Sequence, residues 1–188
     1  LTQRYAWLLR GIERADSLVW DAHKMLLMPS LSTAVLVRDA SHLDNAFTQS
    51  ASYLLSEGKP WYEPAGRNFE ATKPALVLPL YAALRTLGTA YFAEHVDYAY
   101  DLARAFASEV ERRGDFGLLT APQSNIVCFR RRPSDDGSDA LQLKLREEVN
   151  LRGHFFIMRT TLRGKVWLRV VLMNPATRLH DLRKDAKR

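Results

Sequence analysis

The first residues of the chain alternate short apolar runs with polar segments. Residues 8–12 have the spacing of a short helix or turn that ends near Asp16. The apolar run at residues 18–20 predicts a short buried strand, and residues 32–37 predict a second strand. Polar residues 21–24 come directly after the first of these strands. In open α/β sheets, ligands are usually bound just past the carboxyl end of a strand, so this segment is a candidate site.

Two long helices are predicted in the middle of the chain. Turn-forming residues within 53–66 predict a loop. Leucines and alanines then recur at helical spacing through residues 71–87 despite two prolines, and Gly88 is a suitable cap. A further helix is expected at residues 91–113, where Gly114 stops it.

After Gly114 the pattern changes to short strands and short helices. Arg163–Gly164 separates two strand-like runs and predicts a hairpin turn. The second half is therefore expected to be a small α/β domain with an antiparallel sheet. The expected strands are 117–120, 125–131, 154–162 and 165–173, and the expected helices are 139–152 and 176–186.

Composition indicates a globular protein with a modest positive charge. The chain has 188 residues, 47% of them hydrophobic, which is enough for one large domain or two small ones. Its net charge is +6, and the basic residues cluster at 130–132 and 183–188. No aromatic residues interleave with them, so we expect solvated charge rather than a nucleic-acid surface. An anionic cofactor or substrate would suit this charge equally well.

The only cysteine, Cys128, excludes an intramolecular disulfide and fits a reducing, cytoplasmic compartment. It lies in an apolar run, where we expect a small buried side chain. The sequence has no apolar span of membrane-crossing length and no signal peptide, so a soluble protein without a membrane partner is expected. Because the chain begins at Leu1 rather than methionine, we expect a processed, truncated or incompletely represented polypeptide.

The histidines outside residues 21–24 do not predict a metal site. They are far apart and lack ligand spacing with cysteine or acidic residues, which favours surface or capping roles for His42, His95, His154 and His180. Neither a nucleophile elbow nor a glycine-rich phosphate loop is visible in the sequence.

Lys24 is the residue with the clearest chemical potential. A lysine that follows a buried strand and precedes an apolar run would lie partly away from water, which favours the neutral amine that forms Schiff bases. Most lysines at strand ends simply reach water, so spacing alone leaves both roles open.

The string Ala-Asp-Ser-Leu-Val-Trp-Asp-Ala-His-Lys-Met at residues 15–25 resembles the pyridoxal-phosphate (PLP) lysine segment of the group II PLP-dependent amino-acid decarboxylases. This family includes glutamate, aromatic amino-acid, cysteine sulfinate and 2,4-diaminobutyrate decarboxylases. By that resemblance Lys24 would carry PLP as an internal aldimine and, with His23, would take part in catalysis. His23 and Asp21 would sit beside the cofactor and its phosphate. The alternatives are a histidine satisfied by the backbone and an aspartate that caps a turn.

Other segments resemble the same family in the same order along the chain. They are the Gly-Arg segment 66–73, the helix segment 84–88, the small-domain strand 124–130 and the C-terminal strand and turn 168–175. The resemblance places Arg67 among the substrate-binding residues. Tyr62 is the only tyrosine in the short segment that corresponds to the family's mobile loop, and it either meets the substrate or packs as a loop aromatic.

Arg169 is predicted to bind the substrate carboxylate. It is the one arginine among apolar neighbours on a strand expected to be buried on both faces, and a buried guanidinium is costly without an anionic partner. The family's arginine on this strand lies at the substrate carboxylate. A structural salt bridge to a distant acid is the alternative.

The resemblance implies an α/β fold of the fold-type I PLP-dependent transferase architecture. Residues 1–90 would be the end of the PLP-binding large domain, and residues 91–188 the connecting helix and the small domain. The enzyme would be a homodimer that converts an L-amino acid to an amine and CO₂.

The family's N-terminal half supplies most contacts with the PLP ring and phosphate, and none of it is present. A missing segment or separate chain is therefore an expected partner, without which we expect no activity. Two alternatives stay open, namely decarboxylation with deamination to an aldehyde and a non-catalytic fragment that binds a partner.

Overall fold

A computed structural model describes residues 1–46, 67, 69–70, 73–132 and 138–183. The chain divides into two compact units, Leu1–Ala93 and Glu94–Arg188. Each unit mixes helices with antiparallel strands, in agreement with the expected α/β class.

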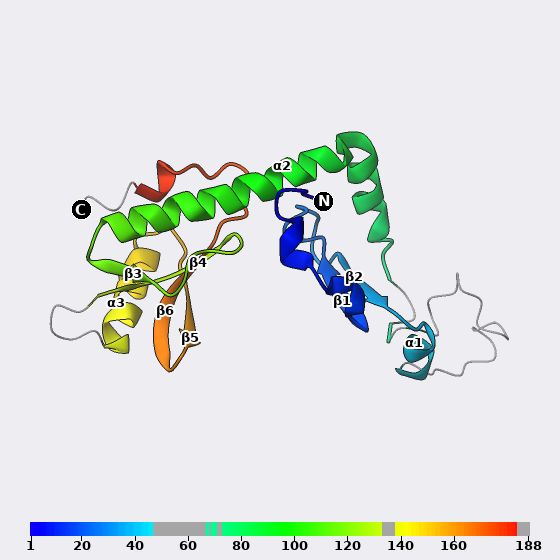
Figure 1. Ribbon diagram of the computed structural model, residues 1–188, viewed down its shortest axis with the longest axis horizontal. Coiled ribbons are helices and arrows are strands. Elements are labelled where there is room, and N and C mark those ends of the chain that lie inside the picture. The colour runs from blue at the N-terminus through cyan, green and yellow to red at the C-terminus, as the bar shows by residue number, and fades with distance from the viewer. Residues whose placement is uncertain (47–66, 68, 71–72, 133–137, 184–188) are drawn as a thin grey trace. The chain divides into compact units, whose positions relative to one another are not determined.

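The first unit is built around a hairpin of two strands (Figure 1). The strands pair in antiparallel register, with Leu18 opposite Leu36 and Asp21 opposite Thr33. Both predicted strands are confirmed, and the expected N-terminal turn is a pair of 3-10 helices. The elements are η1 (Ala6–Leu9), η2 (Ile12–Arg14), β1 (Ser17–Asp21), β2 (Thr33–Val37) and α1 (Ser41–Ala46).

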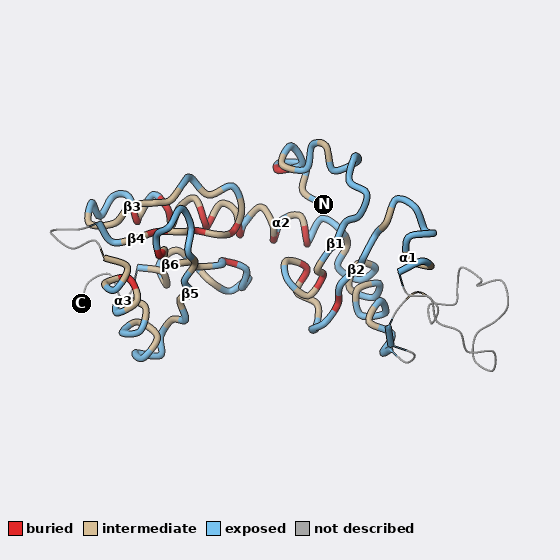
Figure 2. The backbone as a smooth tube through the Cα atoms, turned by 90° about the horizontal axis from the view of Figure 1, so that it is seen from below, coloured by how far each residue is buried: buried red, intermediate tan, exposed pale blue. Residues whose placement is uncertain are grey.

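The hairpin is more exposed than its apolar sequence predicts. Val19 and Val35, which pair on one face, are 62% and 55% exposed, and Leu36 on the other face is 53% exposed. Figure 2 shows pale blue and tan along β1 and β2, whereas red segments lie in the turn after β1, along α2 and in the second unit. The expectation of a buried first strand was therefore wrong within the described residues. Two strands alone supply no second layer to cover either face.

Helix α2 (Val77–Arg112) is interrupted at Gly88, whose φ of 76° and ψ of 164° are not helical. The prediction of two helices separated near Gly88 is confirmed. The first begins at Val77 rather than at residue 71. Pro79 then falls in the first helical turn, where the missing N–H costs no helical hydrogen bond. Helix α2 contributes residues to both compact units.

The second unit contains a four-stranded antiparallel sheet in the order β3-β4-β6-β5. Strands β5 and β6 are joined by Arg163 and Gly164, both with positive φ (53° and 70°), as a tight hairpin of the I′ kind requires. The predicted antiparallel domain and its hairpin are confirmed. The elements are β3 (Phe116–Leu118), β4 (Ile126–Arg131), α3 (Asp139–Leu151), β5 (Met158–Leu162), β6 (Lys165–Val171) and η4 (Asp181–Arg183).

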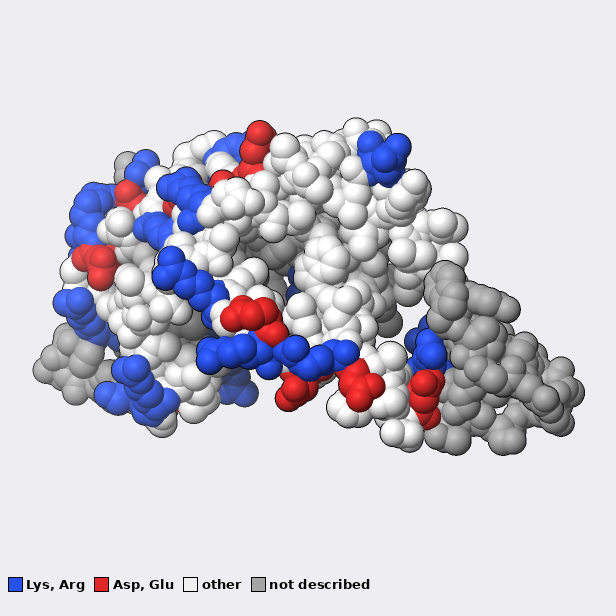
Figure 3. Space-filling model, turned by 45° about the vertical axis from the view of Figure 1, so that its right-hand side comes forward, with Lys and Arg blue, Asp and Glu red and all other residues white. Residues whose placement is uncertain are grey.

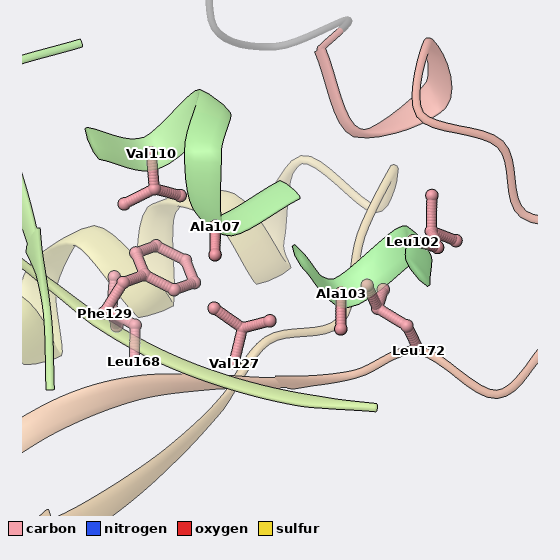
Figure 4. Packing of buried hydrophobic residues seen from close by; sticks show 8 residues of the cluster. All are labelled: Leu102, Ala103, Ala107, Val110, Val127, Phe129, Leu168 and Leu172. Carbon is pink, nitrogen blue, oxygen red and sulfur yellow. The ribbon is translucent and has the colours of Figure 1, made fainter. Parts of the chain in front are cut away.

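The core of this unit lies between α2 and the sheet, as Figure 4 shows. The helix presents a stripe of apolar residues at the spacing of one helical face. The ring of Phe106 meets that of Phe129 edge-on, with centroids 5.6 Å apart. The buried cluster comprises Leu102, Ala103, Ala107, Val110, Val127, Phe129, Leu168 and Leu172.

Helix α3 is tied to the sheet by polar side chains. Ser138 caps its N-terminus by accepting a hydrogen bond from the N–H of Leu141 at 3.3 Å. The buried amide of Gln142 both accepts from the N–H and donates to the carbonyl of Arg131, at 3.0 and 3.2 Å. These bonds satisfy backbone groups at the end of β4, so the helix continues the pairing that a neighbouring strand would supply.

Three expectations about burial and helix ends need correction. Strand β6 is not buried on both faces, because Val166 and Leu168 are buried while Trp167 and Arg169 are only partly so. The α2 core includes Leu168, with Val170 packed against it, and alternate residues of a strand point to opposite faces. His95 was expected at the surface but is 7% exposed, since it lies in the buried stripe of α2.

The expected helix at 176–186 is, in the described part, a turn followed by η4. The side chain of Asn174 accepts from the N–H of Ala176 at 2.9 Å, and that of Asp181 accepts from the N–H of Arg178 at 3.0 Å. Such side-chain bonds to nearby backbone groups compete with helix formation. Residues 184–188 lie outside the described part of the chain.

Candidate functional site

A tight turn directly after β1 positions Lys24. The N–H of Lys24 donates to the carbonyl of Asp21 at 3.3 Å. Two apolar side chains of this turn, those of Ala22 and Leu26, are each 2% exposed and pack with Phe92 of α2. The turn is thus anchored by apolar packing on one side while the lysine projects from the other.

The amine of Lys24 lies against the carboxylate of Asp21. Its Nζ is 2.5 Å from Oδ2, and the other oxygen, Oδ1, accepts from the hydroxyl of Thr33 at 2.6 Å. The hydrogen bonds from Lys24 and then Thr33 hold the pKa of Asp21 below its usual value. The side chain of Lys24 is 61% exposed, so the expected partial desolvation is not present in this chain. The exposed hairpin offers no apolar layer that could withdraw the amine from water.

His23 is held by the second strand of the hairpin. Its Nδ1 is 2.9 Å from the carbonyl oxygen of Ser32, and its backbone N–H donates to the same oxygen at 3.1 Å. Because a carbonyl only accepts, Nδ1 carries the proton in this arrangement. The backbone thus satisfies Nδ1, while Nε2 has no hydrogen-bond partner among the described residues.

Of the two other predicted substrate-binding residues, Arg67 and Tyr62, only Arg67 lies in the described part of the chain. The Nε of Arg67 donates to Oδ1 of Asp44 at 2.7 Å, and both side chains are about three-quarters buried, with exposures of 24% and 27%. An intramolecular acid therefore already pairs with this guanidinium. Tyr62 lies outside the described residues.

Arg169 lies in the second unit, in a row that crosses three strands. It pairs in register with Cys128 of β4 and with Met158 of β5. In the part of the chain that the structure describes, its guanidinium has neither a hydrogen bond nor an ion pair. Cys128 is half-buried rather than fully buried as expected. Burial raises the pKa of its thiol, and the charge of Arg169 opposes this.

In the described part of the chain, the surface and the remaining polar groups suggest no other catalytic centre. On the face that Figure 3 shows, Lys and Arg side chains are interspersed with Asp and Glu. Among the residues described, no cluster of His, Cys, Asp and Glu could hold a metal ion. No helix in the described ranges is long and apolar enough to cross a membrane. Burial lowers the pKa of His95, whose Nε2 is unpartnered within these ranges.

The second unit also contains a cavity of about 940 Å³ that sequence reasoning did not anticipate. None of the predicted site residues lines it. Five phenylalanines give it an apolar wall: Phe106, Phe116, Phe129, Phe155 and Phe156.

Thr33 is the residue of the hairpin site that sequence reasoning missed. It is twelve positions from Asp21 in sequence but directly opposite it in the hairpin register. Pairing the two predicted strands as a hairpin would have pointed to this contact.

The donor groups of the hairpin fit a cofactor that carries an aldehyde. The exposed amine of Lys24 can bond to a carbonyl carbon, and the oriented imidazole of His23 stands beside it in sequence. These residues supply the attachment chemistry, although the described part of the first unit shows no cluster of cations for a phosphate.

Comparisons with known proteins support the same chemistry. Residues 1–132 match the model of the pyridoxal-dependent decarboxylase conserved domain. The chain is 28% identical to an aromatic-L-amino-acid decarboxylase of Bacillus atrophaeus, over 97% of this chain and 39% of the relative. It is also 28% identical to an acidic amino acid decarboxylase of Mus musculus, over 97% of this chain and 36% of the relative.

A solved structure of Oryza sativa TDC with PLP and tryptamine shares the fold, with a TM-score of 0.87 at 23% identity, over 99% of this chain and 40% of that one. The chain thus spans about two-fifths of the length of these relatives. Its fold is part of the α/β fold-type I architecture of PLP-dependent decarboxylases. With the family model matching more than half of its residues, the chain belongs to the pyridoxal-dependent decarboxylase family, whose cofactor is PLP.

Proposed function

We propose that this chain is the C-terminal part of an enzyme that decarboxylates an L-amino acid to its amine and CO₂, with PLP attached at Lys24. One observation carries the proposal. The β1–β2 hairpin holds the amine of Lys24 against Asp21 beside an oriented His23, inside the segment that matches the family model. The chain spans only 39% of the length of one relative. The activity, substrate and partners of the whole enzyme are therefore part of the proposal.

Each residue of the hairpin has a defined task in this proposal. When bound, PLP supplies an electron sink for the electrons of the broken bond between Cα and the carboxylate. Lys24 supplies the primary amine for attachment. His23 keeps its ring in one orientation through Ser32 and presents Nε2 toward the cofactor. Asp21 is proposed to lie beside the cofactor, next to the lysine whose amine it contacts.

Arg169 is proposed to hold the carboxylate of the substrate. Its guanidinium has no acidic partner among the described residues, which weakens the alternative of a structural salt bridge. The planar fork of a guanidinium suits a carboxylate, which it can bind with two parallel hydrogen bonds. Arg67 and Tyr62 remain proposed substrate-binding residues, and Arg67 would have to share its guanidinium with Asp44.

The proposed partner of the chain is the N-terminal half of the same enzyme, as a linked segment or a separate chain, in a cytoplasmic homodimer. The exposed apolar side chains of the hairpin support a covering polypeptide, because monomeric proteins rarely leave such groups in a contiguous patch. Without that half we expect little catalysis, since the covering surface is also needed to exclude water from the site.

Reduction of the PLP-loaded complete enzyme with borohydride, followed by peptide mapping, tests the attachment site. We expect the label on Lys24 alone. A label on any other lysine would remove Lys24 from the proposal.

Product analysis with aromatic and acidic amino acids tests the reaction. Equal amounts of amine and CO₂ support decarboxylation. Recovery of an aldehyde would instead indicate decarboxylation with oxidative deamination. If the complete, PLP-loaded enzyme yields neither product with any amino acid, the non-catalytic alternative is favoured.

A further inference from the structure

We infer that Thr33 is a positioning residue, which fixes the carboxylate of Asp21 so that Asp21 holds the amine of Lys24 whenever that amine is not bonded to the cofactor. The inference rests on the proposed function, in which Lys24 is the attachment residue. It assigns Asp21 to the lysine rather than to the phosphate of the cofactor.

The two oxygens of Asp21 divide between two donors. Oδ2 takes the amine of Lys24 at 2.5 Å, and Oδ1 takes the hydroxyl of Thr33 at 2.6 Å. Asp21 and Thr33 are opposite each other at the end of the hairpin, so their side chains lie on the same face. The strand register thus sets the direction in which the carboxylate faces the lysine.

The hydroxyl of Thr33 also connects this pair to His23. Its oxygen is 3.3 Å from Nδ1 of His23, and Nδ1 in turn lies 2.9 Å from the carbonyl of Ser32. The single proton of the hydroxyl is given to Asp21, so a lone pair of its oxygen faces the imidazole N–H. The side chain of Thr33 therefore contacts both Asp21 and His23, the two polar residues that precede Lys24 in the sequence Asp-Ala-His-Lys.

Electrostatics favour the lysine as the partner of Asp21. A carboxylate placed beside a phosphate would repel it, whereas an opposite charge within hydrogen-bond distance is stabilised. The pKa of Asp21 lies below its usual value because Lys24 and Thr33 both stabilise the anion. The hydrogen bond holds the amine at the carboxylate, and it must be broken before the amine can reach an electrophile. Loss of the carboxylate should therefore make the amine of Lys24 more reactive.

The test measures acetylation of Lys24 by limiting acetic anhydride at pH 8, in the cofactor-free complete enzyme, by peptide mass spectrometry. Lys144 serves as the internal reference, since its amine is 3.9 Å from Glu148 and its side chain is 74% exposed. In Asp21→Asn, acetylation of Lys24 relative to Lys144 should rise about two- to fivefold, the range of a surface ion pair. Thr33→Val should give a smaller rise, and Thr33→Ser, which keeps the hydroxyl, should match the parent.

Asp16→Asn is the matched control. It makes the same charge change on the hairpin, but its carboxylate is 91% exposed and 3.9 Å from Arg38, so the labelling ratio should not change. Circular dichroism checks the fold of each variant, and Thr33→Ala replaces Thr33→Val if the latter does not fold.

An unchanged ratio in Asp21→Asn overturns the inference. So does a ratio in both Thr33→Val and Thr33→Ala equal to that of the parent, or an equal rise in Asp16→Asn. The labelling needs no cofactor, so its result is independent of the borohydride mapping that tests the attachment site.

Discussion

Arg169 lies on β6 between a cysteine of β4 and a methionine of β5. Cys128 and Met158 are its neighbours in register on the adjoining strands, and neither can neutralise a positive charge. A partly desolvated cation without a hydrogen-bonded anion is unfavourable. Binding of a carboxylate at this position would therefore gain from both charge and geometry.

Replacement of Arg169 with Lys keeps the charge and removes the two-pronged donor. We expect kcat/KM to fall by about tenfold or more, as for loss of a charge-assisted hydrogen bond, while PLP content and thermal stability stay near those of the parent. Steady-state kinetics and PLP absorbance of the complete enzyme measure this. Arg159→Lys, at an exposed position on β5, is the control and should leave the kinetics unchanged. A destabilised Arg169→Lys variant with normal kinetics would make Arg169 a structural residue.

At the scale of the elements, one carboxylate connects the start of α3 to two strands. Oδ1 of Asp139 accepts from the backbone N–H of Val166 at 2.9 Å and from Nη1 of Arg130 at 2.8 Å. The side chain of Arg130 is 13% exposed, and its guanidinium also donates to the carbonyl of Val166 at 3.0 Å. The N–H of Val166 first, and Arg130 second, hold the pKa of Asp139 below its usual value.

Asp139→Asn should lower the free energy of unfolding at pH 7, and the difference from the parent should become smaller as the pH falls below 3.8. A carboxyl whose folded-state pKa is depressed stabilises the fold fully above its ordinary pKa of 3.8. That contribution is lost as the pH falls below 3.8 through the folded-state value. Urea unfolding at pH 7 and at pH 3 measures it.

Glu148→Gln is the control for this prediction, because its contact with Lys144 spans 3.9 Å on an exposed part of the same helix. It should change stability little at either pH. A constant gap between Asp139→Asn and the parent from pH 7 to pH 3 would contradict an electrostatic role for Asp139.

At the scale of the whole molecule, the 188-residue chain presents the lysine on an exposed hairpin. Val19, Val35 and Leu36 are each more than half exposed. The aligned relatives are about two and a half times as long as this chain. The proposed cofactor site is thus expected to need surfaces beyond the described hairpin.

We expect the 188-residue chain alone to bind PLP weakly, because a covalent bond to a 61% exposed lysine is readily hydrolysed without ring and phosphate contacts. Addition of the N-terminal polypeptide should restore the visible absorbance of the bound cofactor. Absorbance titration with PLP, with and without that polypeptide, is the measurement. Tight, stoichiometric binding by the chain alone would show that the hairpin suffices.

Several features of the fold could be predicted from sequence because their causes are local. The Arg163–Gly164 turn and the break at Gly88 follow from positive φ, which glycine adopts without strain. The strands of the hairpin and of the small-domain sheet follow from apolar runs bounded by turn residues. Lys24 was found through the resemblance of residues 15–25 to a known segment, which spacing alone could not have provided.

The amino-acid sequence by itself determined where the strands, the turns and the lysine lie, and it indicated the family. Only the tertiary structure decided that the hairpin is exposed, that His95 is buried, that Arg67 pairs with Asp44 and that Thr33 orients Asp21. It also revealed α1, which the apolar pattern did not predict, and the short η4 in place of a longer helix. The physical reason is the distance along the sequence over which each property is determined. Backbone conformation responds to neighbours within a few residues, whereas burial and the choice of polar partners depend on residues brought together from distant positions.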